Sequence, residues 1–168
     1  MSEMLPEDWK IALEAPEPVC PSLQHFRTPV DDGYVAQVGQ ATYAYSYLEW
    51  QIVSIGQKIA PGFGYDMAKK AAGKIAVKLD DELAAFSGDV SLKADLQAVT
   101  QRLKTIVDRR NDLFHAHPAT LKGQQRLQRW TPTRVFNWEP DDIVMFVHEI
   151  EELPDEANAL FYDPRMPR

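Results

Sequence analysis

Three side chains that can bind a phosphate and transfer a proton lie within six residues of each other: Arg110, Asn111 and His115. A guanidinium binds phosphate oxygens through charge-assisted hydrogen bonds. An imidazole changes protonation state near neutral pH, so it can act as a general acid or base. A carboxamide both donates and accepts hydrogen bonds, and can orient the imidazole or hold the phosphate. Together, these groups could act on a phosphodiester without a metal ion.

Charge is unevenly distributed around these three residues. The net charge of −7 argues by itself against a nucleic-acid partner. Residues 100–138 nevertheless hold two acidic side chains, Asp108 and Asp112, against eight basic ones: Arg102, Lys104, Arg109, Arg110, Lys122, Arg126, Arg129 and Arg134. A basic segment beside the motif is what a polyanion site needs. The alternative is a solvated charged surface.

The motif lies at the end of a predicted helix. From about residue 91, apolar residues recur every three or four positions: Leu92, Leu96, Val99, Leu103, Ile106 and Val107. Arg110 continues this apolar stripe, where a cation is costly unless an anion meets it or the stripe opens into a cleft. This departure from the pattern indicates a functional site.

The spacing of the motif sets a geometric problem. In an ideal helix Asn111 and His115 share a face, whereas Arg110 and His115 diverge by roughly 140°. Pro118 disfavours helical geometry at His117, so we expect the helix to end or distort around His115. The long arginine side chain would then cover the remaining gap.

Three more helices are expected from the apolar period. They run from Val35 to Ile59 after an acidic cap at Asp31-Asp32-Gly33, from about Asp66 to Phe86, and from Pro140 across Pro154 to Phe161. Two aromatic-rich runs, 127–130 and 134–138, flank Thr131-Pro132-Thr133 and predict a β-hairpin between the third and fourth helices. The sequence therefore predicts an all-α fold: a four-helix up-down bundle with a short inserted hairpin.

The chain is expected to form one domain, residues 34–168, after an irregular segment, residues 1–33, that contains five prolines. The single cysteine, Cys20, cannot form an internal disulfide or a cysteine-rich zinc site. No apolar run approaches the roughly 20 residues that a membrane span needs, and no signal peptide is recognisable. We therefore expect no membrane association and a cytoplasmic location.

The motif resembles the R-x4-6-H signature of HEPN-superfamily ribonucleases, in which a polar residue, often Asn, follows the arginine. The resemblance implies a helical bundle and metal-independent endoribonuclease activity, in which the ribose 2′-OH attacks the adjacent phosphate. It also implies a homodimer whose composite active site contains Arg110, Asn111 and His115 from two subunits. A toxin, defence or RNA-processing role, with an antitoxin or sensor partner, would follow. The motif covers residues 110–115, and the helical architecture covers about 35–162.

Other residues are expected to support this site. Substrate contacts are predicted for Arg109, His117, Arg126, Arg129, Trp130 and Arg134. An arginine and a tryptophan on the hairpin can stack on a single-stranded nucleobase. Alternatively, Trp130 and Trp138 pack on the bundle while the hairpin arginines stay solvated. Glu49 is either a carboxylate that orients Arg110 or Arg109, or an exposed residue beside the core.

Several alternatives stay open. A metal site at His115 and His117 is disfavoured, because helical metal pairs usually lie three or four residues apart and no further ligands follow at zinc-like spacing. We therefore predict no metal and no cofactor. A non-catalytic HEPN-like module that binds nucleic acid, a nucleotide or a protein is the second functional hypothesis. A purely structural dimer would leave Arg110 unexplained.

Overall fold

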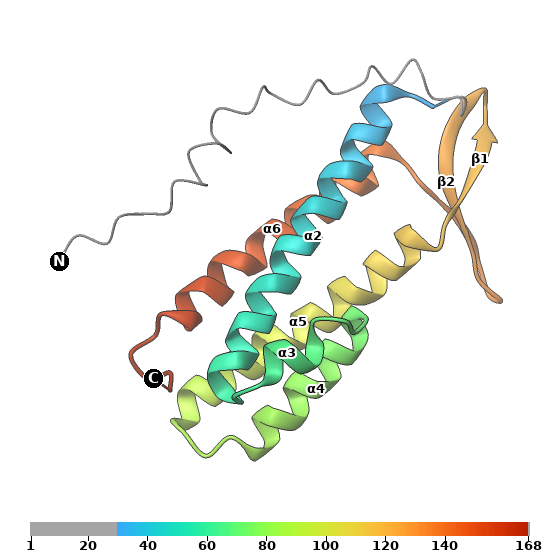
Figure 1. Cartoon of the computed structure of the whole chain (residues 1–168). Helices are drawn as coiled ribbons and strands as arrows, with labels where there is room; N and C mark the ends of the chain where they lie inside the picture. Colours follow the sequence, from blue (N-terminus) through green and yellow to red (C-terminus); the bar gives the residue numbers. More distant parts are fainter. Residues whose placement is uncertain (1–29, 168) are drawn as a thin grey trace, which may run out of the picture.

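The structure is a computed structural model that describes residues 30–167. It is mostly helical with a small three-stranded antiparallel sheet (Figure 1). The elements are α2 (Asp32–Ile59), α3 (Phe63–Met67), α4 (Ala72–Ala85), α5 (Val90–Phe114), β1 (His117–Leu121), β2 (Gln124–Trp130), β3 (Val135–Trp138) and α6 (Pro140–Phe161). Of the irregular segment expected at residues 1–33, residues 1–29, including Cys20, lie outside the described residues. Residues 30–33 are described, and the last two of them already belong to α2.

The predicted helix caps are confirmed. The Asp31 carboxylate accepts the backbone N–H of Tyr34 at 2.7 Å and so satisfies a free donor at the start of α2. Helix α6 begins at Pro140 as expected, and Glu139 and Asp142 form a reciprocal capping box around its first turn. It continues without interruption across Pro154, so the prediction of one long final helix is correct.

The prediction of one continuous helix from about Asp66 to Phe86 is wrong. The segment is split into α3 and α4, with residues 68–71 between them. The Phe63 ring in α3 lies against the backbone of Gly56 in α2, where a Cβ atom would be only 2.4 Å from the ring. Helix α4 instead packs mainly on α5. One straight helix cannot follow both neighbours, and tertiary packing therefore overrides the periodic pattern.

The alternating up-down order is also not found. Helices α2 and α6 run parallel and side by side (Figure 1). Near their starts, Tyr34 Oη donates to the Trp138 carbonyl at 2.8 Å. Near their ends, Lys58 Nζ donates to the Phe161 carbonyl (2.7 Å). Helix α5 runs antiparallel to α6, since Arg109 late in α5 pairs with Glu149, whereas Arg102 earlier in α5 pairs with Glu156 further along α6. The physical reason is the α3 segment, which packs back along α2 and lets α4 start near the end of α5.

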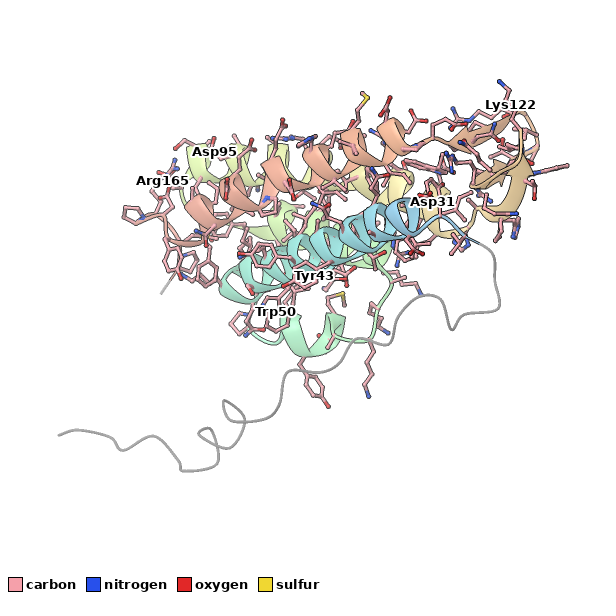
Figure 2. All side chains as sticks on the ribbon, turned by 90° about the horizontal axis from the view of Figure 1, so that it is seen from above. Asp31, Tyr43, Trp50, Asp95, Lys122 and Arg165 are labelled. Atoms are coloured by element: carbon pink, nitrogen blue, oxygen red, sulfur yellow. The ribbon has the colours of Figure 1, made fainter. Side chains whose placement is uncertain are left out.

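The sheet follows α5 in the chain and precedes α6. Strands β2 and β3 form the predicted antiparallel hairpin, but the sheet has three strands where two were expected. The additional strand, β1, pairs with β2 through a two-residue turn at Lys122 and Gly123, whose φ angles are +49° and +81°. Two positive φ values are typical of the type I′ turns that match strand twist. Lys122 lies at one end of the molecule and Arg165 near the other (Figure 2).

The helices enclose one apolar core, to which the sheet contributes Trp138. Its largest fully buried side chains include Leu48, Ile52, Leu79, Leu103 and Phe146. All six apolar residues predicted for the inner stripe of α5 are buried. Arg110 therefore does follow directly on a buried stripe. Among the described helices, none has the length and apolar character needed to cross a membrane.

Candidate functional site

Arg110 is half-buried in the last turns of α5, between two aromatic rings. Its guanidinium carbon lies 4.2 Å from the centroid of the Phe114 ring and 5.3 Å from that of Tyr45 in α2. Nη1 donates to Oδ1 of Asn111 at 3.1 Å. The buried Nε has no hydrogen-bond partner within residues 30–167. Contacts with the two rings stabilise the guanidinium by about 0.5–2 kcal/mol each. Its Nε–H remains a hydrogen-bond donor without a partner in this part of the chain.

Arg110 differs from the other arginines of residues 30–167, because each of those has a carboxylate within 4.0 Å. The pairs are Arg102 with Glu152 and Glu156, Arg109 with Glu149, Arg126 with Glu139, Arg129 and Arg134 with Asp112, and Arg165 with Asp89, Asp95 and Asp163. No such partner is found for Arg110 in this part of the chain. Carboxylates thus neutralise most of the positive charge of residues 100–138. Arg110 is the arginine of this segment that has no carboxylate partner among the described residues, so it can bind an external anion.

Tyr45 and Glu49, one helical turn apart in α2, complete the surroundings of Arg110. Burial raises the pKa of the Tyr45 hydroxyl, the nearby Glu49 charge raises it further, and Arg110 opposes both effects. Burial likewise raises the pKa of the Glu49 carboxyl, against the lowering effect of Arg110 and of the Tyr45 hydroxyl. Within the described residues the Tyr45 hydroxyl has no hydrogen bond of good geometry. Glu49 thus acts on Arg110 through space, without forming a direct ion pair.

His115 is exposed at the end of α5. The helix ends at Phe114, close to where Pro118 was expected to end it, and the His115 N–H donates to the Asn111 carbonyl at 3.0 Å. Within residues 30–167 the imidazole forms no hydrogen bond, and none joins it to Arg110. A free imidazole can accept or deliver a proton at a bound substrate. The five-residue spacing therefore leaves the two groups unlinked within one chain.

Several residues predicted to contact substrate are engaged inside the chain. Arg126 is only 9% exposed; it donates to Glu139 (3.3 Å), to the Gln125 carbonyl (2.8 Å) and to Gln124 (2.7 Å). It also lies 4.9 Å from the Tyr34 ring. These contacts fix β2 to the start of α2 and α6. The geometry gives Arg126 a structural role.

Arg109, Arg129 and Arg134 gather on a different side of α5 from Arg110. Arg109 lies over the rings of Trp138 and Phe146, at 5.7 and 5.1 Å. The two oxygens of Asp112 accept from Arg129 (3.2 Å) and Arg134 (3.4 Å). Another nitrogen of Arg129 donates to the His115 carbonyl at 3.5 Å. This cluster links the sheet to the end of α5.

The two hairpin tryptophans behave differently. Trp130 is 64% exposed, and its indole N–H donates to the side chain of Gln128 at 2.7 Å. Trp138 is 3% exposed and packs against Phe136 and Phe146. His117 is exposed at the start of β1. Trp130 and His117 are therefore open to solvent on the sheet, and Trp138 belongs to the core.

Sequence reasoning missed two groups around Arg110. Tyr45 was assigned to the apolar stripe of its helix, and Phe114 was given no role. The available signal was the four-residue spacing of Tyr45 and Glu49, which places a hydroxyl and a carboxylate on one helix face. The sequence suggested that Glu49 could face Arg110 or Arg109, but it did not show that the Tyr45 ring contacts Arg110, because these two residues lie 65 positions apart.

Within residues 30–167 no three His, Cys, Asp or Glu side chains are grouped so as to hold a metal ion. The geometry offers instead an unpaired guanidinium, a carboxamide and a free imidazole on the last turns of one helix. No protein-family model, curated protein or solved structure matches the chain.

Proposed function

We propose that the protein is a metal-independent endoribonuclease of HEPN type, with Arg110, Asn111 and His115 as its catalytic residues. The observation that carries the proposal is the half-buried Arg110, which has no carboxylate within 4.0 Å among residues 30–167 while the six other arginines there do. A buried cation without a counter-ion is costly. A substrate phosphate would supply the missing anion. The four long helices, α2, α4, α5 and α6, would correspond to the family's bundle.

The proposed reaction is an internal transfer at phosphorus. The ribose 2′-oxygen forms a bond to phosphorus, the bond to the 5′-oxygen breaks, and a cyclic 2′,3′-phosphate remains. One imidazole takes the proton of the 2′-hydroxyl or delivers a proton to the departing 5′-oxygen, which contributes about 10²- to 10⁴-fold in rate. Arg110 stabilises charge on the nonbridging oxygens, worth roughly 1.5–3 kcal/mol. Asn111 hydrogen-bonds the phosphate or the imidazole.

A homodimer would solve the geometric problem of the motif. Arg110 and His115 share no hydrogen bond within one chain, and ideal helix geometry separates their directions by roughly 140°. Two α5 ends related by a two-fold axis would place the imidazole of one subunit beside the guanidinium of the other. The exposed Phe114, at 43%, lies at this end of α5 and would contribute apolar surface.

Two substitutions test the assignment. His115→Ala and Arg110→Ala should each reduce cleavage of mixed single-stranded RNA by at least about 100-fold, because each removes a group that acts in the transition state. His148→Ala, which removes an exposed imidazole on α6, is the matched control and should cleave like wild type. Circular dichroism should show unchanged helicity for all three variants. Undiminished cleavage by either motif variant would refute the assignment.

The second candidate, a HEPN-like module that binds without catalysis, has one observation in its favour. Ion pairs neutralise most of the basic window, so little free positive charge remains to attract a polyanion. Retention of RNA by the wild-type protein with no cleavage products, at low salt and over long incubation, would support this alternative. A catalyst would instead yield cyclic phosphate ends, and its rate would fall as salt rises.

A further inference from the structure

A groove of about 280 Å³ runs between α2 and α6 on the solvent-exposed side of these two parallel helices. Helix α2 contributes Gln40, Tyr43 and Tyr47 to its lining, and α6 contributes Glu151, Pro154 and Asp155. Among the described residues, no part of α5 or of the sheet lines it, so it is separate from Arg110 and His115. Its volume lies just below the range of about 300–1,000 Å³ typical of small-molecule sites, which favours side chains of a partner as its occupant.

Three exposed aromatic side chains of α2 form a stripe along this groove. Tyr43, Tyr47 and Trp50 are 78%, 51% and 66% exposed, and their spacing of four and three residues places them on one face of the helix. Figure 2 shows Tyr43 and Trp50 on α2, away from the end of the molecule that Lys122 marks. The Gln51 side-chain amide donates to Tyr47 Oη at 3.0 Å, which holds that ring in place. A row of exposed rings on one helix face is typical of an interaction site.

The acidic side chains in the middle of α6 fall into two groups. One group faces α5, where arginines pair with Glu149, Glu152 and Glu156. The other group, Glu151 and Asp155, lines the groove, and neither has a lysine or arginine within 4.0 Å among residues 30–167. Glu151 approaches the ring of His148 at 4.0 Å. The groove therefore keeps two carboxylates for an external cation, beside rings whose faces attract cations.

The charge of the groove decides between its possible occupants. Residues 1–29 hold five acidic side chains against two basic ones, and a second copy of the chain carries a net charge of −7, so the two carboxylates disfavour both. RNA is repelled for the same reason. A metal ion would need further ligands, and no three metal-ligating side chains gather within residues 30–167. A protein partner with lysine or arginine side chains suits both the carboxylates and the ring faces.

We propose that the groove binds a helix of a partner protein that carries lysine or arginine residues four positions apart. Tyr43 and Tyr47 are four residues apart, as are Glu151 and Asp155, so each pair repeats at roughly 6 Å along its helix. A partner helix presents side chains at the same interval and can lie along α2 and α6 with its basic face inward. The proposal goes beyond ribonuclease activity and does not rest on it, because the motif residues lie outside the groove.

The test follows the isotope-labelled whole protein by NMR while an alanine-based helical peptide that carries lysines four residues apart is added. Amide resonances of residues 43–50 and 151–155 should shift and reach saturation, because these segments border the groove. Raising the salt from about 0.1 M to about 1 M should weaken binding several-fold, since the screening length falls from about 10 Å to about 3 Å. The same peptide with glutamine in place of lysine should cause no saturable shifts.

Two variants remove the recognition elements separately. Glu151→Gln together with Asp155→Asn should weaken binding of the lysine peptide about three- to ten-fold, because two ion pairs are lost. Tyr43→Leu keeps an apolar side chain but removes the ring face, and should weaken binding about two- to five-fold. All three side chains are exposed, so the fold should persist in both variants.

Matched controls remove the same chemistry elsewhere. Asp81→Asn together with Asp108→Asn removes two charges from exposed positions on α4 and α5, and Tyr65→Leu removes a 91% exposed ring from α3. Both controls should bind the peptide like wild type. The proposal is overturned if the wild type gives no saturable shifts, if the shifts lie on other surfaces, or if the groove variants bind no more weakly than the controls.

Two further results would assign the groove to another occupant and would also overturn the proposal. One is self-association of the wild type at rising concentration, measured by sedimentation, that the groove variants abolish. The other is binding to phosphatidylcholine vesicles that Tyr43→Leu abolishes. RNA cleavage decides the ribonuclease proposal separately, because the groove variants retain Arg110 and His115, and a wild type that cleaves no RNA can still bind the peptide.

Discussion

Arg110 and Glu49 carry opposite charges on different helices, and each is half-buried. The guanidinium is held by the Tyr45 and Phe114 rings, with no direct ion pair to Glu49. A direct pair would neutralise Arg110 and occupy the donors that a phosphate needs. Without a direct pair, the nearby Glu49 charge still attracts the guanidinium, whose Nη1 donates to Asn111 and whose Nε has no partner within residues 30–167. This explains how a cation can persist next to an apolar stripe without a bound ligand.

The Glu49 carboxyl leads to a prediction on pH dependence. Burial raises its pKa, so the carboxyl ionises less readily in the folded than in the unfolded chain. The stability that it contributes is fully present below the unfolded pKa and is lost as pH rises through the folded one. Glu49→Gln cannot ionise, and its free energy of unfolding should therefore rise relative to wild type as pH increases from the unfolded pKa of about 4.3 through the higher folded one, measured by urea denaturation.

The control for this prediction is Glu151→Gln, which removes one negative charge from an exposed position on α6. It corrects for the general effect of net charge on stability. If the difference between wild type and Glu49→Gln stays constant over the pH range, the buried carboxyl is not the group that titrates. The same variant should lose RNA cleavage if Glu49 holds Arg110 in its reactive position, since the charge and not the shape is changed.

At the scale of elements, the decisive contact is the one between α3 and α2. The Phe63 ring fills the space where a side chain at position 56 would lie. It turns the chain back along α2, splits the predicted second helix into α3 and α4, and lets α4 begin beside Asn111. The end of α5 that carries the motif is consequently flanked by α2 on one side and the sheet on another.

Two glycines of α2 test this contact. Gly39→Ala meets no atom within 4 Å and should stabilise the protein by about 0.5–1 kcal/mol, because alanine loses less backbone entropy in a helix. Gly56→Ala places Cβ at 2.4 Å from the Phe63 ring and should destabilise it by about 1–3 kcal/mol. Thermal unfolding followed by circular dichroism compares them. Equal effects at the two positions would mean that α3 does not pack on α2 as described.

At the scale of the whole molecule, the proposed activity depends on a second copy of the chain. Arg110→Ala and His115→Ala are each expected to be inactive alone, but a heterodimer of the two would hold one intact pair of Arg110 and His115. Equal mixing should restore about a quarter of wild-type activity, since half of the dimers are mixed and each has one intact site. Cleavage assays after subunit exchange measure this, and analytical ultracentrifugation measures the dimer.

An inactive mixture of the two variants would contradict the proposed composite site. If the protein sediments as a monomer, or if the mixture stays inactive although mixed dimers form, the two motif residues do not work across an interface. Activity of the wild type would then have to arise within one chain, with His115 or Arg110 moving toward the other on substrate binding. This result does not test whether an antitoxin or sensor protein binds the chain.

The sequence alone determined the elements whose signals are local. The cap at Asp31, the start at Pro140 and the long apolar stripes of α5 and α6 depend on neighbouring residues, and these predictions are confirmed. The sequence also singled out Arg110, because a cation that follows an apolar stripe is visible in the pattern itself. This prediction did not require knowledge of the residues that contact Arg110 in the folded chain.

Only the tertiary structure decided the break between α3 and α4, the parallel direction of α2 and α6, and the strand β1, whose sequence lacks an apolar alternation. It also decided which arginines are paired and that the Tyr45 ring lies against the Arg110 guanidinium. These features depend on contacts between residues far apart in the chain, and their energies come from packing and ion pairing rather than from local propensity. A linear cluster of positive charge therefore predicted a basic surface, whereas ion pairs neutralise most of it within residues 30–167 and leave Arg110 and Lys122 without an acidic partner there.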